Sequence, residues 1–418
     1  MRSLYTIVLW LLMPYVFFRL LWRTRKQPDY LDHIGERFGY YSLNCDKPVI
    51  WLHAVSVGET RATQSLVSKL LADFPEYQIL LTNTTPTGRN AAKQIYGDSV
   101  LRVYLPYDYP FAINRFLLHF RPKLGILMET EIWFNLIHFC HISDTPIILL
   151  NARMSEKSAK GYLRFARLTR NALSELSAIS AQTNEDALRL TVLGGKDVTV
   201  MGNLKFDIEP PAVMMELGSQ LRNQFGATRK IFLAASTRDG EEMLLLNIME
   251  NLHIPGLLMV IVPRHPQRFD TVATLLAQRG IEFQRRSDGK DVPAEINVLL
   301  GDSMGEMFAY YVAADLAYIG GSLLPFGGQN LIESCAVGTP VVVGPHTYNF
   351  SEVTELAVKY GSALQVQNQA ELTESIQKMF ERPEILQEMR KQCARFVESN
   401  RGATERSMQI VTTILDKY

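Results

Sequence analysis

The stretch GGSLLPFGGQNLIE occupies residues 320–333 and is followed by GTPVVVGPH at residues 338–346. The pattern predicts a glycine-rich loop that leads into a helix and then a buried strand, because glycines let the backbone turn sharply and approach a ligand. Asn330 and Glu333 stand three apart where the helix is expected to begin, so an amide and a carboxylate share one face beside unpaired backbone N–H groups. Such a loop suits a nucleotide or a sugar phosphate, whereas a lone Gly-Gly pair more often serves packing alone.

Short apolar runs alternate with helix-like stretches on both sides of a central segment. They occupy residues 49–52, 78–81, 124–128 and 146–150, and then 231–235, 257–262, 296–300, 316–319 and 340–343. Continuous apolar runs of this length are typical of parallel strands that are covered on both faces. Between the two series lies NLKFDIEPP at residues 203–211, whose paired prolines indicate a linker. We therefore expect an α/β protein with two Rossmann-like domains facing a central cleft.

The N-terminal stretch from Leu4 to Trp22 is almost wholly apolar and nearly long enough to span a bilayer, which requires roughly 20 residues. A basic cluster, residues 23–26, follows it, whereas Arg2 alone precedes it, so the positive-inside bias places the rest of the chain in the cytoplasm. We expect a membrane anchor over residues 1–26, not a cleaved signal peptide, because no small-residue cleavage site follows. Two alternatives stay open: a full span, or a helix in one leaflet with Arg19 reaching the surface.

The composition excludes some classes of function. Lys plus Arg and Asp plus Glu both total 43 residues, and this balance argues against nucleic-acid binding. The hydrophobic content of 47% supports sizeable cores for two domains. The four cysteines, at positions 45, 140, 335 and 393, lack metal-ligand spacing. A zinc site and a disulfide framework are therefore not expected, and a reducing compartment fits.

Polar residues follow several of the predicted strands. In WLHAVSVGET at residues 51–60, Glu59 opens the next helix and is a candidate general base, or else an acid that merely favours the helix dipole. Glu129 and Glu131 follow the strand at 124–128 with the same two interpretations. Arg153 follows residues 146–150 and is equally suited to pairing with an acid or touching a ligand.

Three cations of the central segment and the second half lie in similar turns. Arg264 follows the strand at 257–262, and Lys205 and Arg238 are further candidates for binding anionic groups. Asp302 is more often a helix cap at such a position and receives no catalytic role.

Taken together, the motifs resemble those of the Kdo transferases, membrane-anchored enzymes of lipopolysaccharide core assembly that transfer 3-deoxy-D-manno-octulosonic acid (Kdo). The matching segments run along essentially the whole chain in the order of the family: HAVSVGE (53–59), PTG (86–88), YLPYD (104–108), METE (128–131), NAR (151–153), GNLKFD (202–207), PRHP (263–266), GDSMGE (301–306) and GPH (344–346).

The resemblance implies a GT-B fold. An acceptor domain at residues 27–205 and a donor domain at residues 206–418 would follow the anchor, and the last helix can pack back on the first domain. It also implies transfer of Kdo from CMP-Kdo to a lipid A precursor (lipid IVA) at the cytoplasmic face of the bacterial inner membrane, with inversion. By analogy Glu59 is the base, and Glu129 and Lys205 support the transition state. CMP would be held by Pro263, Arg264, Met304, Gly305, Glu306, Asn330, Leu331, Ile332 and Glu333.

The resemblance implies neither a metal nor a cofactor, since CMP-Kdo is a co-substrate and no Asp-x-Asp motif occurs. One departure concerns the donor loop, where Gln329 stands in place of the usual histidine and cannot titrate near neutral pH. Three alternatives remain: a GT-B transferase with another donor or acceptor, a UDP-sugar 2-epimerase of similar architecture, and a membrane-tethered sugar-nucleotide binder without catalysis. The binder predicts that Glu59 is dispensable.

Overall fold

The computed structural model describes residues 1–25 and 27–417. The chain forms two compact units, an N-terminal domain of Met1–Asp207 with Arg401–Tyr418 and a C-terminal domain of Ile208–Asn400. The domain boundary thus lies after Asp207, close to the boundary at residue 205 expected from the sequence, and the last segment of the chain returns to the first domain. Lys26, which ends the predicted anchor, lies outside the described residues.

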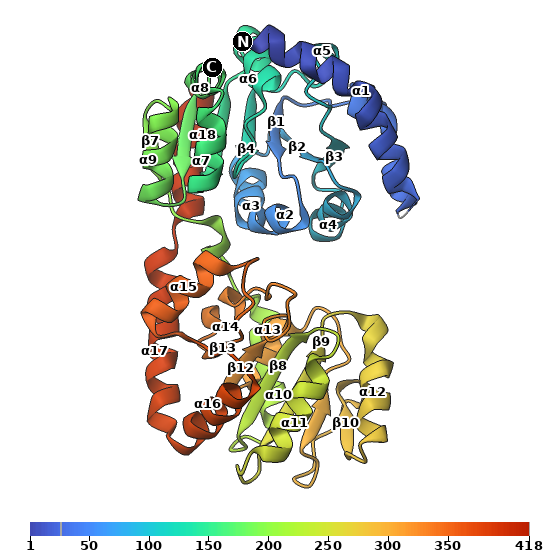
Figure 1. The fold of residues 1–418 in the computed structure, drawn as a ribbon, viewed down its shortest axis with the longest axis vertical. Helices are drawn as coiled ribbons and strands as arrows, with labels where there is room; N and C mark the ends of the chain where they lie inside the picture. Colours follow the sequence, from blue (N-terminus) through green and yellow to red (C-terminus); the bar gives the residue numbers. More distant parts are fainter. Residues whose placement is uncertain (26, 418) are drawn as a thin grey trace. The chain divides into compact units, whose positions relative to one another are not determined.

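The described residues of the N-terminal domain contain a seven-stranded sheet in the order β3-β2-β1-β4-β5-β6-β7, with all neighbours parallel (Figure 1). Its strands are β1 (Val49–His53), β2 (Gln78–Asn83), β3 (Leu101–Tyr104), β4 (Leu124–Met128), β5 (Ile147–Ala152), β6 (Ala178–Ala181) and β7 (Val198–Val200). Alternate residues of β1 enter two different cores: Val49 and Trp51 join one, and Ile50 and Leu52 join the other. Both faces of the sheet are therefore covered, as continuous apolar strands require.

Several helices of this domain begin at a side-chain cap. Thr85 accepts the N–H of Gly88 at 3.1 Å to start α4, and Ser155 and Thr183 do the same for α7 and α9. The helices are α1 (Arg2–Thr24), α2 (Val57–Ala62), α3 (Gln64–Asp73), α4 (Pro86–Tyr96), α5 (Pro110–Phe120), α6 (Phe134–Ile142), α7 (Glu156–Leu163), α8 (Ala166–Ser174), α9 (Asn184–Leu193) and α18 (Ala403–Leu415), with short 3₁₀ turns η1 (Pro28–Tyr30), η2 (Ile34–Phe38) and η3 (Leu204–Phe206). The returning helix α18 packs against α3 and η3.

The C-terminal domain contains, within its described residues, a second seven-stranded parallel sheet in the order β10-β11-β9-β8-β12-β13-β14. The strands are β8 (Ile231–Thr237), β9 (Leu258–Pro263), β10 (Phe283–Arg285), β11 (Val298–Leu300), β12 (Leu316–Ile319), β13 (Val341–Val343) and β14 (Ala363–Gln365). The helices are α10 (Ala212–Phe225), α11 (Glu241–Asn251), α12 (Phe269–Gln278), α13 (Met307–Ala313), α14 (Ile332–Ala336), α15 (Ser351–Tyr360), α16 (Gln369–Glu381) and α17 (Pro383–Asn400), with η4 (Pro266–Arg268) and η5 (Arg286–Asp288). The predicted α/β class with two Rossmann-like domains is confirmed.

The first helix, α1, is long and apolar enough to cross a membrane, with a mean hydropathy of 1.8 over its most apolar window. It stays helical through Pro14, and most of its side chains are exposed. This helix occupies most of the stretch predicted as an anchor.

Candidate active site

The strand order of each sheet reverses at one place, and several of the predicted site residues follow the strands that meet there. In the N-terminal domain β1 pairs with β4, although β2 and β3 lie between them in the chain. In the C-terminal domain β8 pairs with β12 in the same way. Ligands of open α/β sheets bind beyond the carboxyl ends of the strands at such switch points. Glu59 and Glu129 follow the first pair of strands, and the glycine-rich loop follows β12.

Glu59 lies in the first turn of α2, and its carboxylate has two hydrogen-bond donors nearby. The Ser56 hydroxyl caps this helix by accepting the N–H of Glu59 at 3.4 Å. In return, Glu59 Oε2 accepts the N–H of Val55 at 2.7 Å, and Oε1 accepts the Ser56 hydroxyl at 3.1 Å. The carboxylate therefore supports the start of the helix, as expected for an acid that favours the helix dipole. The same two hydrogen bonds hold it in one orientation.

Burial raises the pKa of Glu59 to about 7, although the hydrogen bond from Val55 opposes this rise. The negative charges of Glu129 and Glu131 raise this pKa further, and the bond from Ser56 lowers it. A carboxyl group with a pKa near 7 can accept a proton from a substrate and release it again at neutral pH. The arrangement therefore has the chemistry of a general base.

Glu129 occupies a strained backbone position at the end of β4. Its φ is +56°, a region that non-glycine residues enter rarely. Its N–H donates to the carbonyl of Leu150 at 3.1 Å, and its own carbonyl accepts the N–H of Arg153 at 3.3 Å, so the end of β5 holds it there. The Lys205 ammonium lies 3.4 Å from Glu129 Oε1, which places two of the three predicted catalytic residues in one ion pair.

His53 and Glu131 complete this region. The His53 ring is fully buried, and its Nδ1 lies 2.9 Å from the Thr82 hydroxyl and 3.0 Å from the Thr82 carbonyl. Burial lowers the pKa of His53 to about 4, so the ring is neutral at physiological pH. Glu131 accepts the Trp133 indole N–H at 2.6 Å, and its Oε2 lies 3.9 Å from His53 Nε2. Glu131 thus adds negative charge near Glu59.

The glycine-rich loop of the C-terminal domain is organised by a buried carboxylate. Glu241 accepts the N–H groups of Gly321 at 2.6 Å and Leu323 at 3.2 Å, and the hydroxyl of Tyr318 at 2.5 Å. The Gly320 backbone passes so close to β8 that a Cβ atom there would lie 2.3 Å from the Ser236 carbonyl oxygen. Glycine is therefore required for this approach, which brings the loop to the switch point.

Arginines surround His265 beside this loop. Arg238 stacks over the Phe326 ring at 5.0 Å, and its guanidinium lies 2.9 Å from His265 Nε2. Partial burial and the charges of Arg238, Arg264 and Arg268 lower the pKa of His265. The local field is therefore positive, which suits a phosphate group. Pro263 ends β9, and Arg264 is fixed by its N–H, which donates to the Thr237 carbonyl at 3.0 Å.

The predicted donor segment 304–306 precedes α13. Met304 is 60% exposed, and Gly305 has a φ of +80°. The Glu306 carboxylate accepts the Ser303 hydroxyl at 2.7 Å and lies 3.3 Å from Arg286. The sequence favoured Asp302 as a helix cap, but Asp302 does not cap α13. Its carboxylate instead accepts the backbone N–H of Ser287 at 2.9 Å and the Ser287 hydroxyl at 2.7 Å.

The predicted donor segment 330–333 forms the turn into the short helix α14. The Asn330 side chain accepts the N–H of Ile332 at 3.0 Å and donates to the Glu333 carboxylate at 3.3 Å. The Leu331 and Ile332 side chains are buried, so they fix the position of the two polar residues. The expected sequence of loop, helix and strand is confirmed, and the amide and the carboxylate that were expected on one face are hydrogen-bonded to each other.

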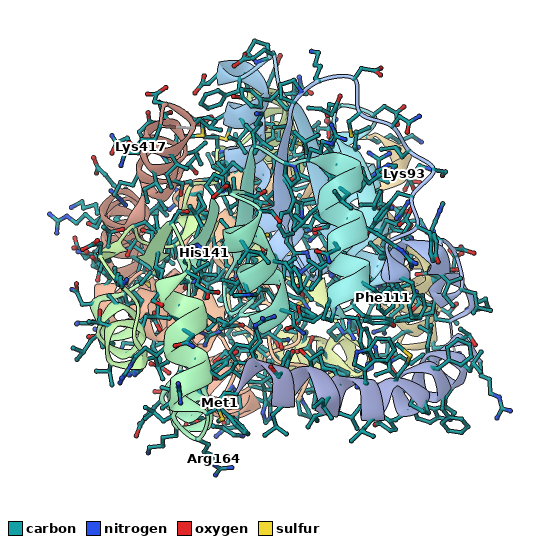
Figure 2. All side chains as sticks on the ribbon, turned by 90° about the horizontal axis from the view of Figure 1, so that it is seen from above. Met1, Lys93, Phe111, His141, Arg164 and Lys417 are labelled. Atoms are coloured by element: carbon teal, nitrogen blue, oxygen red, sulfur yellow. The ribbon has the colours of Figure 1, made fainter. Side chains whose placement is uncertain are left out.

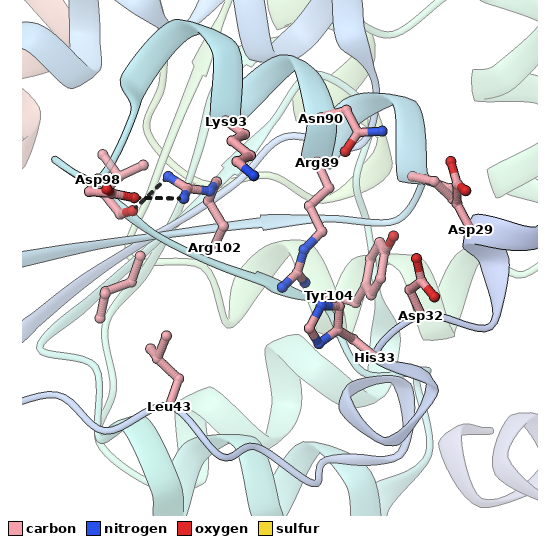
Figure 3. A pocket seen from close by; sticks show the side chains of 13 residues that line it. Asp29, Asp32, His33, Leu43, Arg89, Asn90, Lys93, Asp98, Arg102 and Tyr104 are labelled. Atoms are coloured by element: carbon pink, nitrogen blue, oxygen red, sulfur yellow. Dashed lines mark hydrogen bonds and ion pairs between the residues drawn. The ribbon is translucent and has the colours of Figure 1, made fainter.

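Among the described residues, no group of three or more His, Cys, Asp or Glu side chains could hold a metal ion. A surface pocket of about 420 Å³ lies beside α4 and β3 and is lined by charged side chains (Figure 3). Its arginines already have partners, because Arg102 lies 3.3 Å from Asp98 and Arg89 lies 2.6 Å from Glu36. The predicted site residues are absent from the described lining of this pocket, so it is separate from the candidate site.

The sequence did not predict the role of Glu241, which shapes the glycine-rich loop from the first turn of α11. An acid in the first turn of a helix is common, so its sequence context gave no signal. The hydrogen bonds of Asp108 were not predicted either. Its buried carboxylate accepts the N–H groups of Asn135 at 3.1 Å and Leu136 at 2.8 Å, a contact that only the fold creates.

Comparison with solved structures supports the fold. A glycosyltransferase from Rickettsia africae is 13% identical, with 90% of this chain and 100% of that chain covered and a TM-score of 0.57. The UDP-GlcNAc 2-epimerase from Neisseria meningitidis is 16% identical, with 89% and 100% covered and a TM-score of 0.57. Since a transferase and an epimerase match equally well, this likeness shows the GT-B architecture alone.

Comparison of sequences identifies the family. A family model described as 3-Deoxy-D-manno-octulosonic-acid transferase (kdotransferase) matches residues 32–208, and a model of glycosyl transferases group 1 matches residues 281–398. The 3-deoxy-D-manno-octulosonic acid transferase of Haemophilus influenzae is 36% identical, covering 100% of this chain and 99% of that protein. Its counterpart from Bordetella pertussis is 38% identical, covering 97% and 98%. Because these matches extend over both domains, the chain belongs to the Kdo transferase family of glycosyltransferases.

Proposed function

We propose that this chain transfers Kdo from CMP-Kdo to a hydroxyl group of a lipid A precursor (lipid IVA), with Glu59 as the general base. The observation that supports it most is the state of the Glu59 carboxylate. It lies at the switch point of the first sheet, two hydrogen bonds orient it, and its pKa is about 7. Family membership supports Kdo as the transferred sugar.

In the proposed step, the ionised Glu59 takes the proton of the acceptor hydroxyl. The hydroxyl oxygen then forms a bond to the anomeric carbon of Kdo, and the bond from that carbon to the phosphate oxygen of CMP breaks. The electron pair leaves with CMP, and attack from the opposite side inverts the anomeric carbon. Proton removal by a positioned base contributes typically about 10²–10⁴-fold to such a rate.

Glu129 and Lys205 are proposed to support the transition state. Their ion pair, at 3.4 Å, is fixed by the strained backbone of Glu129. A preformed pair of charges needs little reorganisation when charge develops on the reacting groups, and this lowers the barrier. The Glu129 carboxylate also helps to keep the pKa of Glu59 above its usual value.

The C-terminal domain is proposed to bind the CMP portion of the donor. Arg264 and the backbone N–H groups of the loops at 304–306 and 330–333 would neutralise the single phosphate of CMP. Since one phosphate carries a limited charge, the transfer is proposed to need no metal and no cofactor. The lipid acceptor and α1 support a location at the bacterial inner membrane, with both domains on the cytoplasmic side.

The test is product mass spectrometry after incubation of the full chain with lipid IVA and CMP-Kdo. We expect one or more Kdo mass increments from the parent protein and a loss of about 10²–10⁴-fold for Glu59→Gln, because the amide cannot accept the proton. Glu156→Gln, an exposed acid on α7 paired with Lys160, is the matched control and should be unaffected. Full transfer by Glu59→Gln would show that Glu59 is not the general base.

A transferase with another nucleotide sugar or acceptor is the second candidate, and Gln329 favours it. An amide at this position of the donor loop cannot become an imidazolium, so donor choice can differ. Titration with CMP separates the two candidates. If CMP binds, Arg264→Ala should weaken its binding about 10–100-fold, while Arg279→Ala, just after α12 and paired with Glu250, should not. CMP binding without Kdo transfer would favour the second candidate.

A further inference from the structure

Helix α1 has two faces with different surroundings. The face that is turned to the N-terminal domain contains Tyr5, Leu9, Met13, Val16 and Leu20, which are at least partly covered. The opposite face is a stripe with the spacing of one helix side, defined here as the outer stripe: Leu4, Val8, Leu11, Tyr15 and Trp22. Its members are 44–75% exposed, so a continuous apolar surface lies on the outside of the molecule.

Polar contacts attach the first half of α1 to the domain. The Tyr5 hydroxyl donates to Asp108 at 2.9 Å, and the Thr6 hydroxyl donates to the Asn135 side chain at 3.1 Å. The Tyr109 hydroxyl donates to the Leu9 carbonyl at 2.9 Å. Because Asp108 is buried and also binds the start of α6, these contacts join α1 to the interior of the fold.

Aromatic packing continues the contact along the helix. Trp10 lies 5.4 Å from the Tyr109 ring and 5.6 Å from the Phe111 ring. Figure 2 shows α1 running from the labelled Met1 along the side of the domain, with Phe111 beside it. Farther along, α1 and the side chains of Phe38 and Tyr107 line an apolar cavity of about 670 Å³. The helix therefore contacts the domain from Tyr5 to Leu20, over about 22 Å of its axis.

This docking conflicts with a membrane-spanning position. If α1 crossed the bilayer while docked, Asp108 and the domain surface beside the helix would enter the hydrocarbon layer with it. Arg115, whose guanidinium lies 5.2 Å from the Phe111 ring, would enter too, and a single charge at the centre of a bilayer costs about 2.5–3.5 kcal/mol or more. If α1 undocked instead, the hydroxyls of Tyr5 and Thr6 would lose their partners.

We propose that α1 stays docked on the N-terminal domain and lies in the plane of the membrane, with its outer stripe inserted into one leaflet of an anionic lipid bilayer. Arg19, Arg23 and Arg25 are exposed near one end of the helix, where they meet anionic headgroups. The proposal rests on the membrane location in the proposed function, but not on Glu59 or on the donor. Its tests measure the position of α1 and the binding of the protein to membranes, so their outcomes do not depend on whether the protein transfers Kdo.

The first test uses the accessibility of the start of α1. The full chain with Cys45→Ser and Ser3→Cys is reconstituted into vesicles of phosphatidylcholine and phosphatidylglycerol and treated with a membrane-impermeant maleimide. Ser158→Cys on α7 is labelled in parallel and gives the fraction of molecules whose domains lie on the outside of the vesicles. We expect Ser3→Cys to be labelled to the same extent as Ser158→Cys without detergent. Labelling of Ser3→Cys only after detergent would show a spanning helix and overturn the proposal.

A cross-link tests the docked state itself. In the same vesicles, Thr6→Cys with Asn135→Cys should be joined by a short thiol cross-linker, because these side chains touch. Leu11→Cys with Asn135→Cys is the matched control and should remain unlinked, since Leu11 belongs to the outer stripe and is 75% exposed. Cross-linking in detergent but not in vesicles would show that α1 leaves the domain in a membrane, which also overturns the proposal.

Vesicle binding tests the outer stripe. Leu11→Ser with Tyr15→Ser should lower the partition of the full chain into anionic vesicles at least tenfold and leave the cross-link of Thr6→Cys with Asn135→Cys intact. Val213→Ser, an exposed apolar position on α10 of the other domain, should have no effect. Unchanged partition after loss of Leu11 and Tyr15 would show that another surface binds the lipid.

Discussion

Glu59 serves the start of α2 and the proposed proton transfer with the same carboxylate. Its two hydrogen bonds favour the ionised form, whereas burial and the neighbouring acids favour the neutral form. The second influence prevails, because the pKa lies near 7 and not near 4.5. A helix cap and a general base are therefore compatible at one position.

The pH profile of transfer should follow Glu59. Because only the ionised carboxylate accepts a proton, kcat/KM should rise with pH around 7, and at pH 6 it should be about a fifth of its value at pH 7. Glu131→Gln removes a negative neighbour and should shift the midpoint to lower pH. Glu156→Gln, remote and exposed, should not shift it. A midpoint that stays in place in Glu131→Gln would contradict this electrostatic coupling.

The backbone of Glu129 can be tested separately from its charge. Glu129→Gly and Glu129→Ala both remove the ion pair with Lys205, but only glycine accepts a φ of +56° without strain. The glycine variant should therefore be the more stable of the two by about 1 kcal/mol in the free energy of unfolding, measured with urea. Equal stabilities would indicate that the end of β4 relaxes when the side chain is removed.

At the scale of elements, the sequence predicted most of the central strands, but neither the interior strand β6 nor the strands at the edges of the sheets. Runs such as Leu124–Met128 and Leu316–Ile319 are strands with the predicted bounds, because burial on both faces requires continuous apolar residues. The peripheral strands β7 and β10 are only partly buried and three residues long, so their patterns resemble loops. Contacts that depend on the fold, such as those of Glu241 and Asp108, could not be predicted from local pattern.

The packing of α10 against α13 predicts an unusual effect of alanine. A Cβ atom at Gly218 would lie 2.4 Å from the Val312 Cβ, so Gly218→Ala should destabilise the C-terminal domain by about 1–3 kcal/mol despite the helix propensity of alanine. Gly161 in α7 is the control, because a Cβ atom there meets no heavy atom within 4 Å. Gly161→Ala should stabilise by about 0.5–1 kcal/mol. Thermal unfolding measures the change in stability of both variants. If Gly218→Ala stabilised the protein, the result would contradict the close contact between α10 and α13.

At the scale of the whole molecule, the N-terminal domain is completed by the last segment of the chain. Asp207 accepts the N–H of Gly402 at 2.7 Å and that of Thr404. Met408, Val411 and Ile414 of α18 belong to one of the two cores of the first sheet. Each of these side chains contributes about 1.5–3 kcal/mol by burial, which together approaches the stability of a whole domain.

Removal of residues 401–418 should therefore unfold the N-terminal domain and spare the C-terminal one. We expect rapid proteolysis within residues 1–207 and a resistant fragment of residues 208–400, which retains CMP binding if the proposed donor site is correct. A shorter deletion after Leu415 leaves α18 whole and should have little effect. Resistance of both domains after the longer deletion would mean that α18 is dispensable for folding.

The returning segment also sets the order of events during synthesis. The ribosome releases residues 1–207 well before Arg401–Tyr418, so the apolar surface that α18 covers stays open while the C-terminal domain is being made. The C-terminal domain is continuous in the chain and can fold as soon as it emerges. The N-terminal domain, with the apolar α1 already outside the ribosome, therefore reaches its final form only after the returning segment has emerged.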